Sequence, residues 1–151
     1  NASQPVANTT QPNVSTQQPV ANTAQPANNT VQPTAANGDY YKAYPNAAPA
    51  TQVETVKGLF YTVQVGVYSK PVPASNMKNI SPLNSELTAT QKIRYTSGMY
   101  NNLEAAVNQR DAAKTLGIGD AFITAYYNGV RITLSEADRL LKELGPTILV
   151  K

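Results

Sequence analysis

A proline-bearing repeat at the N-terminus limits the fold of this chain more than any other feature. Reading from Gln4, the chain runs QPVANTT, QPNVSTQ, QPVANTA, QPANNTV and QPTAANG, so Gln-Pro recurs every seven residues. The period is that of a coiled coil, but each proline removes a backbone donor and clashes with the preceding helical turn. Residues 1–38 carry no charge and no large apolar seam. They are predicted to form a long extended low-complexity spacer, because they cannot bury enough apolar surface to offset their conformational entropy.

Residues 39–56 form a second segment, a linker with the sequence DYYKAYPNAAPATQVETV. Three tyrosines stand out in it: Tyr40, Tyr41 and Tyr44. Aromatic rings with a polar tip are common interface anchors, so these tyrosines are candidate partner-docking residues, and the repeat units are candidates for the same role. The alternative is that the rings lie on the adjacent domain and that the repeat is only a spacer.

The composition excludes several classes of function. The chain has no His, Cys or Trp, which removes imidazole-based triads, thiolate chemistry, Cys/His zinc sites and disulfides. The spacing of the carboxylates suggests no catalytic pair, so we expect a protein that is not an enzyme and that uses no metal or cofactor. The net charge of +3 is mild and unclustered, which argues against nucleic acid as a partner. No apolar run approaches the roughly 20 residues of a membrane-spanning helix.

The apolar periodicity predicts one folded domain over residues 57–151. Alternating patterns predict strands, and stretches of helical spacing bounded by capping residues and by glycine predict helices. Asn101 or Asn102 is expected to cap one helix, and Thr133 with Glu136 resembles the capping box of another. The expected strands are 59–68, one before residue 92, 92–98, 121–127 and 130–132, and the expected helices are a short one near 74–80, one ending at Gly117, and one over 134–144.

A weak internal duplication organises these elements. TVQVGVY (62–68) aligns with RYTSGMY (94–100), and each copy is followed by a candidate helix. Two such units predict an α+β fold, β-α-β-β-α-β, with an antiparallel sheet and helices on one face. Because side chains alternate along a strand, each strand has one face toward the helices and one toward solvent. The helix-facing residues are expected to be Val63, Val65 and Tyr95, and the open face is expected to display Thr62, Gln64, Arg94 and Thr96.

The chain resembles the SPOR domain family over roughly residues 59–127. The resemblance lies in YTVQVGVYSK and in RYTSGMYNNLEAAVNQRDAAKTLG, with their Val-Gln and Gly-x-aromatic steps. It implies a ferredoxin-like fold that binds peptidoglycan glycan strands on the exposed sheet face, in the periplasm or cell envelope of a bacterium. By motif position, Gln64 matches the family's sheet-face glutamine, and the strand-end glycines and aromatic positions are matched by Gly66, Gly98, Tyr68 and Tyr100.

The chemistry of the expected open face suits a neutral glycan. Amide and guanidinium groups bond sugar hydroxyls, and aromatic rings pack on the C–H faces of the sugar. The glycan-binding candidates are therefore Thr62, Gln64, Arg94, Thr96 and a flanking ring, Tyr126 or Tyr127. Two hypotheses remain: a non-catalytic peptidoglycan-binding module, or a protein–protein interaction module of an outer-membrane secretion, gliding-motility or adhesin complex that docks through the repeat and the tyrosine linker.

Overall fold

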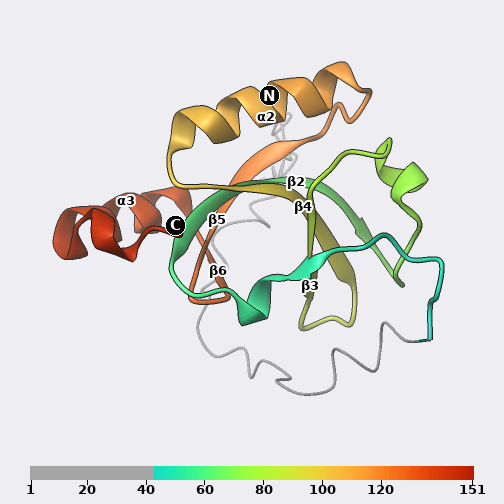
Figure 1. The fold of residues 1–151 in the computed structure, drawn as a ribbon, viewed down its shortest axis with the longest axis horizontal. Coiled ribbons are helices and arrows are strands. Elements are labelled where there is room, and N and C mark those ends of the chain that lie inside the picture. Colours follow the sequence, from blue (N-terminus) through green and yellow to red (C-terminus); the bar gives the residue numbers. More distant parts are fainter. Residues whose placement is uncertain (1–42) are drawn as a thin grey trace, which may run out of the picture.

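The computed structural model describes residues 43–151 (Figure 1). The predicted spacer, 1–38, and two of the three linker tyrosines, Tyr40 and Tyr41, lie outside the described residues. The described part is an α+β fold with one six-stranded sheet, which confirms the predicted class. The strands are β1 (Thr51–Gln52), β2 (Leu59–Tyr68), β3 (Leu83–Leu87), β4 (Ile93–Tyr100), β5 (Phe122–Tyr127) and β6 (Val130–Ile132).

The sheet is mixed, with the strand order β1-β3-β4-β2-β5-β6. Strand β1 pairs with β3 in parallel, and the other neighbouring pairs are antiparallel. Residues 51–55, which the sequence placed in the linker, thus belong to the fold as β1 and the 3₁₀ helix η1 (Val53–Thr55). The sheet therefore has an edge strand, β1, that the sequence did not predict.

Two α-helices each follow a strand after a short connection. Helix α2 (Leu103–Thr115) follows β4, and helix α3 (Leu134–Leu144) follows β6. The Asn102 side chain accepts a hydrogen bond from the Ala105 amide at 2.8 Å, and the Thr133 hydroxyl accepts one from the Glu136 amide at 3.0 Å. Both predicted N-caps are therefore present. The helix expected near 74–80 is only a four-residue 3₁₀ helix, η2 (Ala74–Met77), because prolines on both sides leave no room for more. A last 3₁₀ helix is η3 (Pro146–Ile148).

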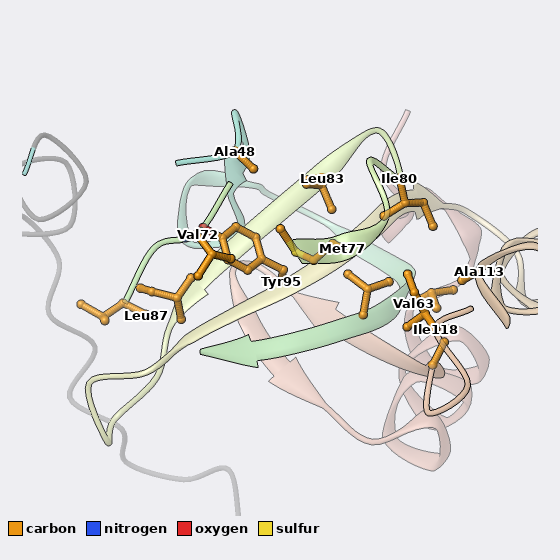
Figure 2. Close-up of a cluster of buried hydrophobic side chains, with 13 residues drawn as sticks. Ala48, Val63, Val72, Met77, Ile80, Leu83, Leu87, Tyr95, Ala113 and Ile118 are labelled. Carbon is orange, nitrogen blue, oxygen red and sulfur yellow. Dashed lines mark hydrogen bonds between the residues drawn. The ribbon is translucent and has the colours of Figure 1, made fainter. Parts of the chain in front are cut away.

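The core lies between the sheet and its helices, as the alternation of β2 predicts. Val63, Val65 and Tyr95 are buried on this face, and α2 contributes Ala113 to the same cluster (Figure 2). A second cluster joins Ala106 of α2 and Ala137 of α3 to the other half of the sheet. Both α-helices therefore cover one face, which is the convex side of the sheet in Figure 1.

Two Gly-x-Tyr steps have the same local structure. A Cβ on Gly66 would lie 2.6 Å from the Tyr68 ring, and a Cβ on Gly98 would run into the Tyr100 ring. Each tyrosine ring thus lies over the glycine two residues before it on the same strand. Tyr68 and Tyr100 are therefore packing residues, and the sequence duplication marks two sites of ring-on-glycine packing.

Two β-bulges bend the sheet at these steps. Between β2 and β4 the register passes from Tyr61↔Tyr100 to Val63↔Ser97, which leaves an extra residue on β4 beside Gly98. Gly98 has φ +75°, a conformation that favours glycine in such a bulge. A second register shift follows between Gln64 and Gly66 on β2. Because bulges bend a strand and increase its twist, the sheet curls away from the helices.

The curl brings the two ends of the sheet together. Gly129 lies in the turn before the edge strand β6, and a Cβ on it would lie 2.8 Å from the carbonyl oxygen of Glu54 in η1. The η1 segment follows the opposite edge strand, β1. The β5–β6 turn and η1 thus lie side by side, near the label of β6 in Figure 1, and close the concave face along part of its length.

Candidate functional site: the concave face of the sheet

The predicted glycan-binding surface corresponds to the concave face, and its centre is sealed. Thr62 and Thr96 are 0% and 1% exposed, so the prediction that they face a ligand is wrong. They belong to an internal network around Asn84, whose amide nitrogen lies 3.2 Å from the Thr96 hydroxyl and 2.8 Å from the Gly98 carbonyl oxygen. The Thr62 hydroxyl donates to the Ser97 carbonyl oxygen at 3.0 Å. The alternation assigned these side chains to the right face, but their hydrogen bonds join β2, β3 and β4.

Tyr126, the predicted stacking ring, is also fully buried, which corrects a third predicted contact. Its ring stacks on Phe60 with centroids 5.4 Å apart, and Val53 of η1 completes this cluster. The Tyr126 hydroxyl donates to Glu86 Oε2 at 2.5 Å. Three strand spacings would separate β5 from β3 by about 14 Å in a flat sheet. The bond forms because the sheet is curled, and the ring crosses the concave face above the strands between them.

Arg94 is bound inside the same network. Its Nη1 atom lies 2.6 Å from Glu86 Oε2, and the two side chains are 18% and 17% exposed. Burial alone would lower the pKa of Arg94, but the Glu86 carboxylate raises it. Burial, together with Glu86, raises the pKa of the Tyr126 phenol well above 10. Arg94 thus donates one hydrogen bond within the network through Nη1, and its buried Nε has no partner among residues 43–151.

Several side chains of the concave face are not buried, and most of them lie at the end where β2 extends beyond β5. We define the rim as Gln64, Val67, Arg94, Phe122 and Arg131. Gln64 is directly opposite Phe122 on β5, and Val67 is directly opposite Arg94 on β4. Phe122 and Val67 are 42% and 41% exposed. The rim thus places an exposed aromatic ring opposite an amide, on the face that also carries the Arg94 and Arg131 guanidinium groups.

Gln64 is half-buried, and its side-chain oxygen is shielded from solvent and has no hydrogen-bond partner in the described part of the chain. The prediction that it faces away from the helices is compatible with its register opposite Thr96 and Phe122, which also lie on the concave side. Its predicted contact with a glycan stays a prediction. Gln64 and Arg94 are the two predicted site residues that lie on the accessible rim.

Sequence reasoning missed two rim residues, Phe122 and Arg131. Phe122 is in phase with Tyr126 along β5, so the alternation that selected Tyr126 selects Phe122 equally. Arg131 is directly opposite Tyr126 across the turn at Asn128 and Gly129. The signals for both residues were therefore present. The sequence did not indicate that the curvature of the sheet would bury the Tyr126 ring and leave the Phe122 ring exposed.

Arg131 extends from β6 over the rim. Its Nε donates to the Thr124 hydroxyl at 3.0 Å, and the side chain is half-buried. Burial lowers the pKa of Arg131, as does the neighbouring Arg94, and the Tyr126 phenol and Glu86 oppose this only in part. The rim therefore has a positively charged end.

The third linker tyrosine, Tyr44, is half-buried, and its carbonyl oxygen accepts a hydrogen bond from the Ala47 amide at 3.0 Å. Its predicted role in docking a partner stays a prediction. Within residues 43–151, no group of three or more His, Cys, Asp and Glu side chains is placed to hold a metal ion. No helix of the described region combines the length and the apolar character needed to cross a membrane.

Comparison with known proteins gives no relative on which to base an assignment: no family model matches the chain, and no curated protein or solved structure is significantly similar to it. The function must therefore be argued from the geometry of the rim and from the sequence.

Proposed function

We propose that this chain is a non-catalytic module of a bacterial cell-envelope protein, and that it binds peptidoglycan glycan strands in the periplasm through the rim. The observation that carries the proposal is the pairing of Phe122 with Gln64. An exposed ring beside an amide offers an apolar surface for the C–H face of a sugar and hydrogen bonds for its hydroxyls. The buried centre, including Thr62, Thr96 and Tyr126, supports the rim without touching the ligand.

The strand order supports the SPOR-like, ferredoxin-like part of the proposal. The four longer strands follow the order β3-β4-β2-β5, with the first and third of them along the chain, β2 and β4, at the centre. In this interpretation the short η2 stands where the first helix of a β-α-β-β-α-β unit would be, and α2 is the second helix. The strand β1 and helix α3 are then additions at the two ends.

Retention on purified cell-wall sacculi tests the proposal, with the full chain and single variants. Phe122→Ala and Gln64→Ala should each weaken retention, by about tenfold for the loss of a stacking ring. Leu144→Ala is the matched control, because Leu144 is also an exposed apolar side chain, at 51%, but lies on α3 at the helix-covered side. Retention of Phe122→Ala and Gln64→Ala equal to that of the control would exclude the rim as the glycan site.

A second candidate function, protein–protein interaction, is favoured by a different observation. The last residues of β2, 65–68, pair with β4 on one side, whereas β5 ends its pairing at Gln64. Strands that are paired on one side can accept an added strand from a partner. This candidate predicts that deletion of residues 1–45 abolishes assembly with envelope proteins, whereas the glycan proposal predicts that the deletion leaves sacculus binding intact.

A further inference from the structure

Arg131 differs from every other arginine in the described part of the chain. Arg94 pairs with Glu86, Arg110 with Asp111, and Arg139 with two glutamates of α3. No carboxylate of residues 43–151 lies within 4.0 Å of the Arg131 guanidinium, although the side chain is half-buried. A guanidinium that has lost part of its hydration without gaining an anion is in an unfavourable environment.

The neighbouring groups increase this imbalance. Arg94 adds a second positive charge. Its carboxylate partner, Glu86, already accepts hydrogen bonds from both the Arg94 guanidinium and the Tyr126 hydroxyl. Glu54 also lies on the concave side, but its Oε1 accepts from the Leu87 amide at the β3 edge. The buried carboxylates are therefore turned toward the protein, and the positive charge of Arg131 remains available at the rim.

The Arg131 side chain is held in position for a ligand. Its Nε bond to Thr124 fixes the plane of the guanidinium and leaves both Nη groups without a protein partner among the described residues. Two parallel N–H donors from one guanidinium match the two oxygens of a carboxylate. On the same concave side, Gln64 Oε1 and Arg94 Nε also lack partners, but both atoms are buried, whereas the Arg131 Nη groups are not among the buried unpartnered atoms.

We propose that Arg131 binds a carboxylate of the ligand, so that the rim recognises an acidic carbohydrate and discriminates against a neutral one. This inference rests on the proposed function, because it adds a charge requirement to the same surface. The carboxylate would lie at the Arg131 end, and the sugar ring would lie on Phe122 beside Gln64.

The test compares two forms of one matrix: sacculi stripped of their stem peptides, used either directly or after their remaining carboxylates have been converted to neutral methylamides. The full chain should be retained about tenfold less on the amidated form, the factor expected for one charge-assisted hydrogen-bonded pair. Arg131→Gln should be retained equally on both forms, at the lower level. Arg131→Lys keeps the charge without the fork and should retain part of the preference.

Arg110→Gln is the matched control, because it removes the same charge from α2, on the helix-covered side, and it should behave as the wild type. Equal retention of the wild type on native and amidated sacculi would overturn the carboxylate inference while leaving the proposed function standing. Retention on neither form would overturn both. Loss of the preference in Arg110→Gln as well as in Arg131→Gln would show that net charge, and not the Arg131 site, is responsible, which also overturns the inference.

Discussion

Replacement of Tyr126 by Phe tests whether the bond between β5 and β3 holds the sheet in its curled form. The change removes one hydroxyl and keeps the stack on Phe60. Hydrogen bonds to charged groups contribute about 1.5–3 kcal/mol to stability. Glu86 keeps its ion pair with Arg94 in the variant, so no carboxylate is left without a partner. We therefore expect the free energy of unfolding to fall by the lower part of that range, about 1.5–2 kcal/mol.

Tyr68→Phe is the matched control, because its hydroxyl donates to the neutral carbonyl oxygen of Asn76 at 3.1 Å in a solvent-exposed place. Its loss should lower the free energy of unfolding by about 0.5–1 kcal/mol. Urea unfolding followed by circular dichroism gives both values, provided that the slope m is unchanged. If Tyr126→Phe costs no more than Tyr68→Phe, the hydroxyl–carboxylate bond does not hold the curl.

The pH dependence gives an independent measurement on the same variant. The folded-state pKa of Tyr126 is raised well above 10, so the hydroxyl stabilises the fold fully below the pKa of the unfolded chain. As pH rises above about 10, the unfolded phenol ionises and the folded one does not. The stability advantage of the wild type over Tyr126→Phe should therefore shrink by about 1.4 kcal/mol per pH unit. An advantage that stays constant from pH 9 to 11 would contradict the buried hydrogen bond, since the other tyrosines are common to both proteins.

Three further predictions concern the bulge, the η1 segment and the first α-helix. In chemical denaturation, Gly98→Ala should lower the free energy of unfolding by more than about 2 kcal/mol, because φ is +75° and the new methyl group meets a tyrosine ring. The control Gly119→Ala has open space around it and should change the free energy of unfolding by less than about 0.5 kcal/mol. Burial raises the pKa of Glu54, so the wild type should lose stability relative to Glu54→Gln as pH rises above about 4.5. The side-chain amide oxygen of the Gln variant can still accept the hydrogen bond from the Leu87 amide. If the melting temperatures of the two proteins change in parallel with pH, the raised pKa of Glu54 is contradicted. Asn102→Ala should cost about 1 kcal/mol by loss of the α2 cap, measured by urea unfolding; an unchanged midpoint would show that the cap contributes nothing.

The sequence was sufficient to predict most elements of the domain, though not β1 and η1, and the faces of the β2 residues before the bulge at Gly66. Alternation correctly separated Val63 and Val65 from Thr62, because it depends only on the local geometry of an extended chain. It could not predict exposure, since exposure depends on whether distant segments cover a face. The buried threonines look like solvent-facing residues in the sequence because their partner, Asn84, is on another strand and 12 or more residues away.

The curvature was present in the sequence only as two glycines. Both glycines were matched to strand-end positions of the resembled family, but a bulge bends a sheet by an amount that the sequence does not specify. The consequence appears at the opposite end of the fold, where η1 meets the β5–β6 turn at Gly129. No pattern in residues 51–55 announces this contact, so the segment was assigned to the linker.

The position of the rim follows from the unequal lengths of two strands. β2 continues to Tyr68, whereas its pairing with β5 extends only to Gln64, so the closing structure built on β5 and β6 cannot cover the last part of β2. There Phe122, the first residue of β5, is left exposed next to Gln64. If β5 began several residues earlier, the added pairing would cover this end of the concave face as Tyr126 and η1 cover the centre. A ligand surface on this fold is therefore expected where β5 begins, and the identity of residue 122 should influence binding more than that of any buried residue on the same face.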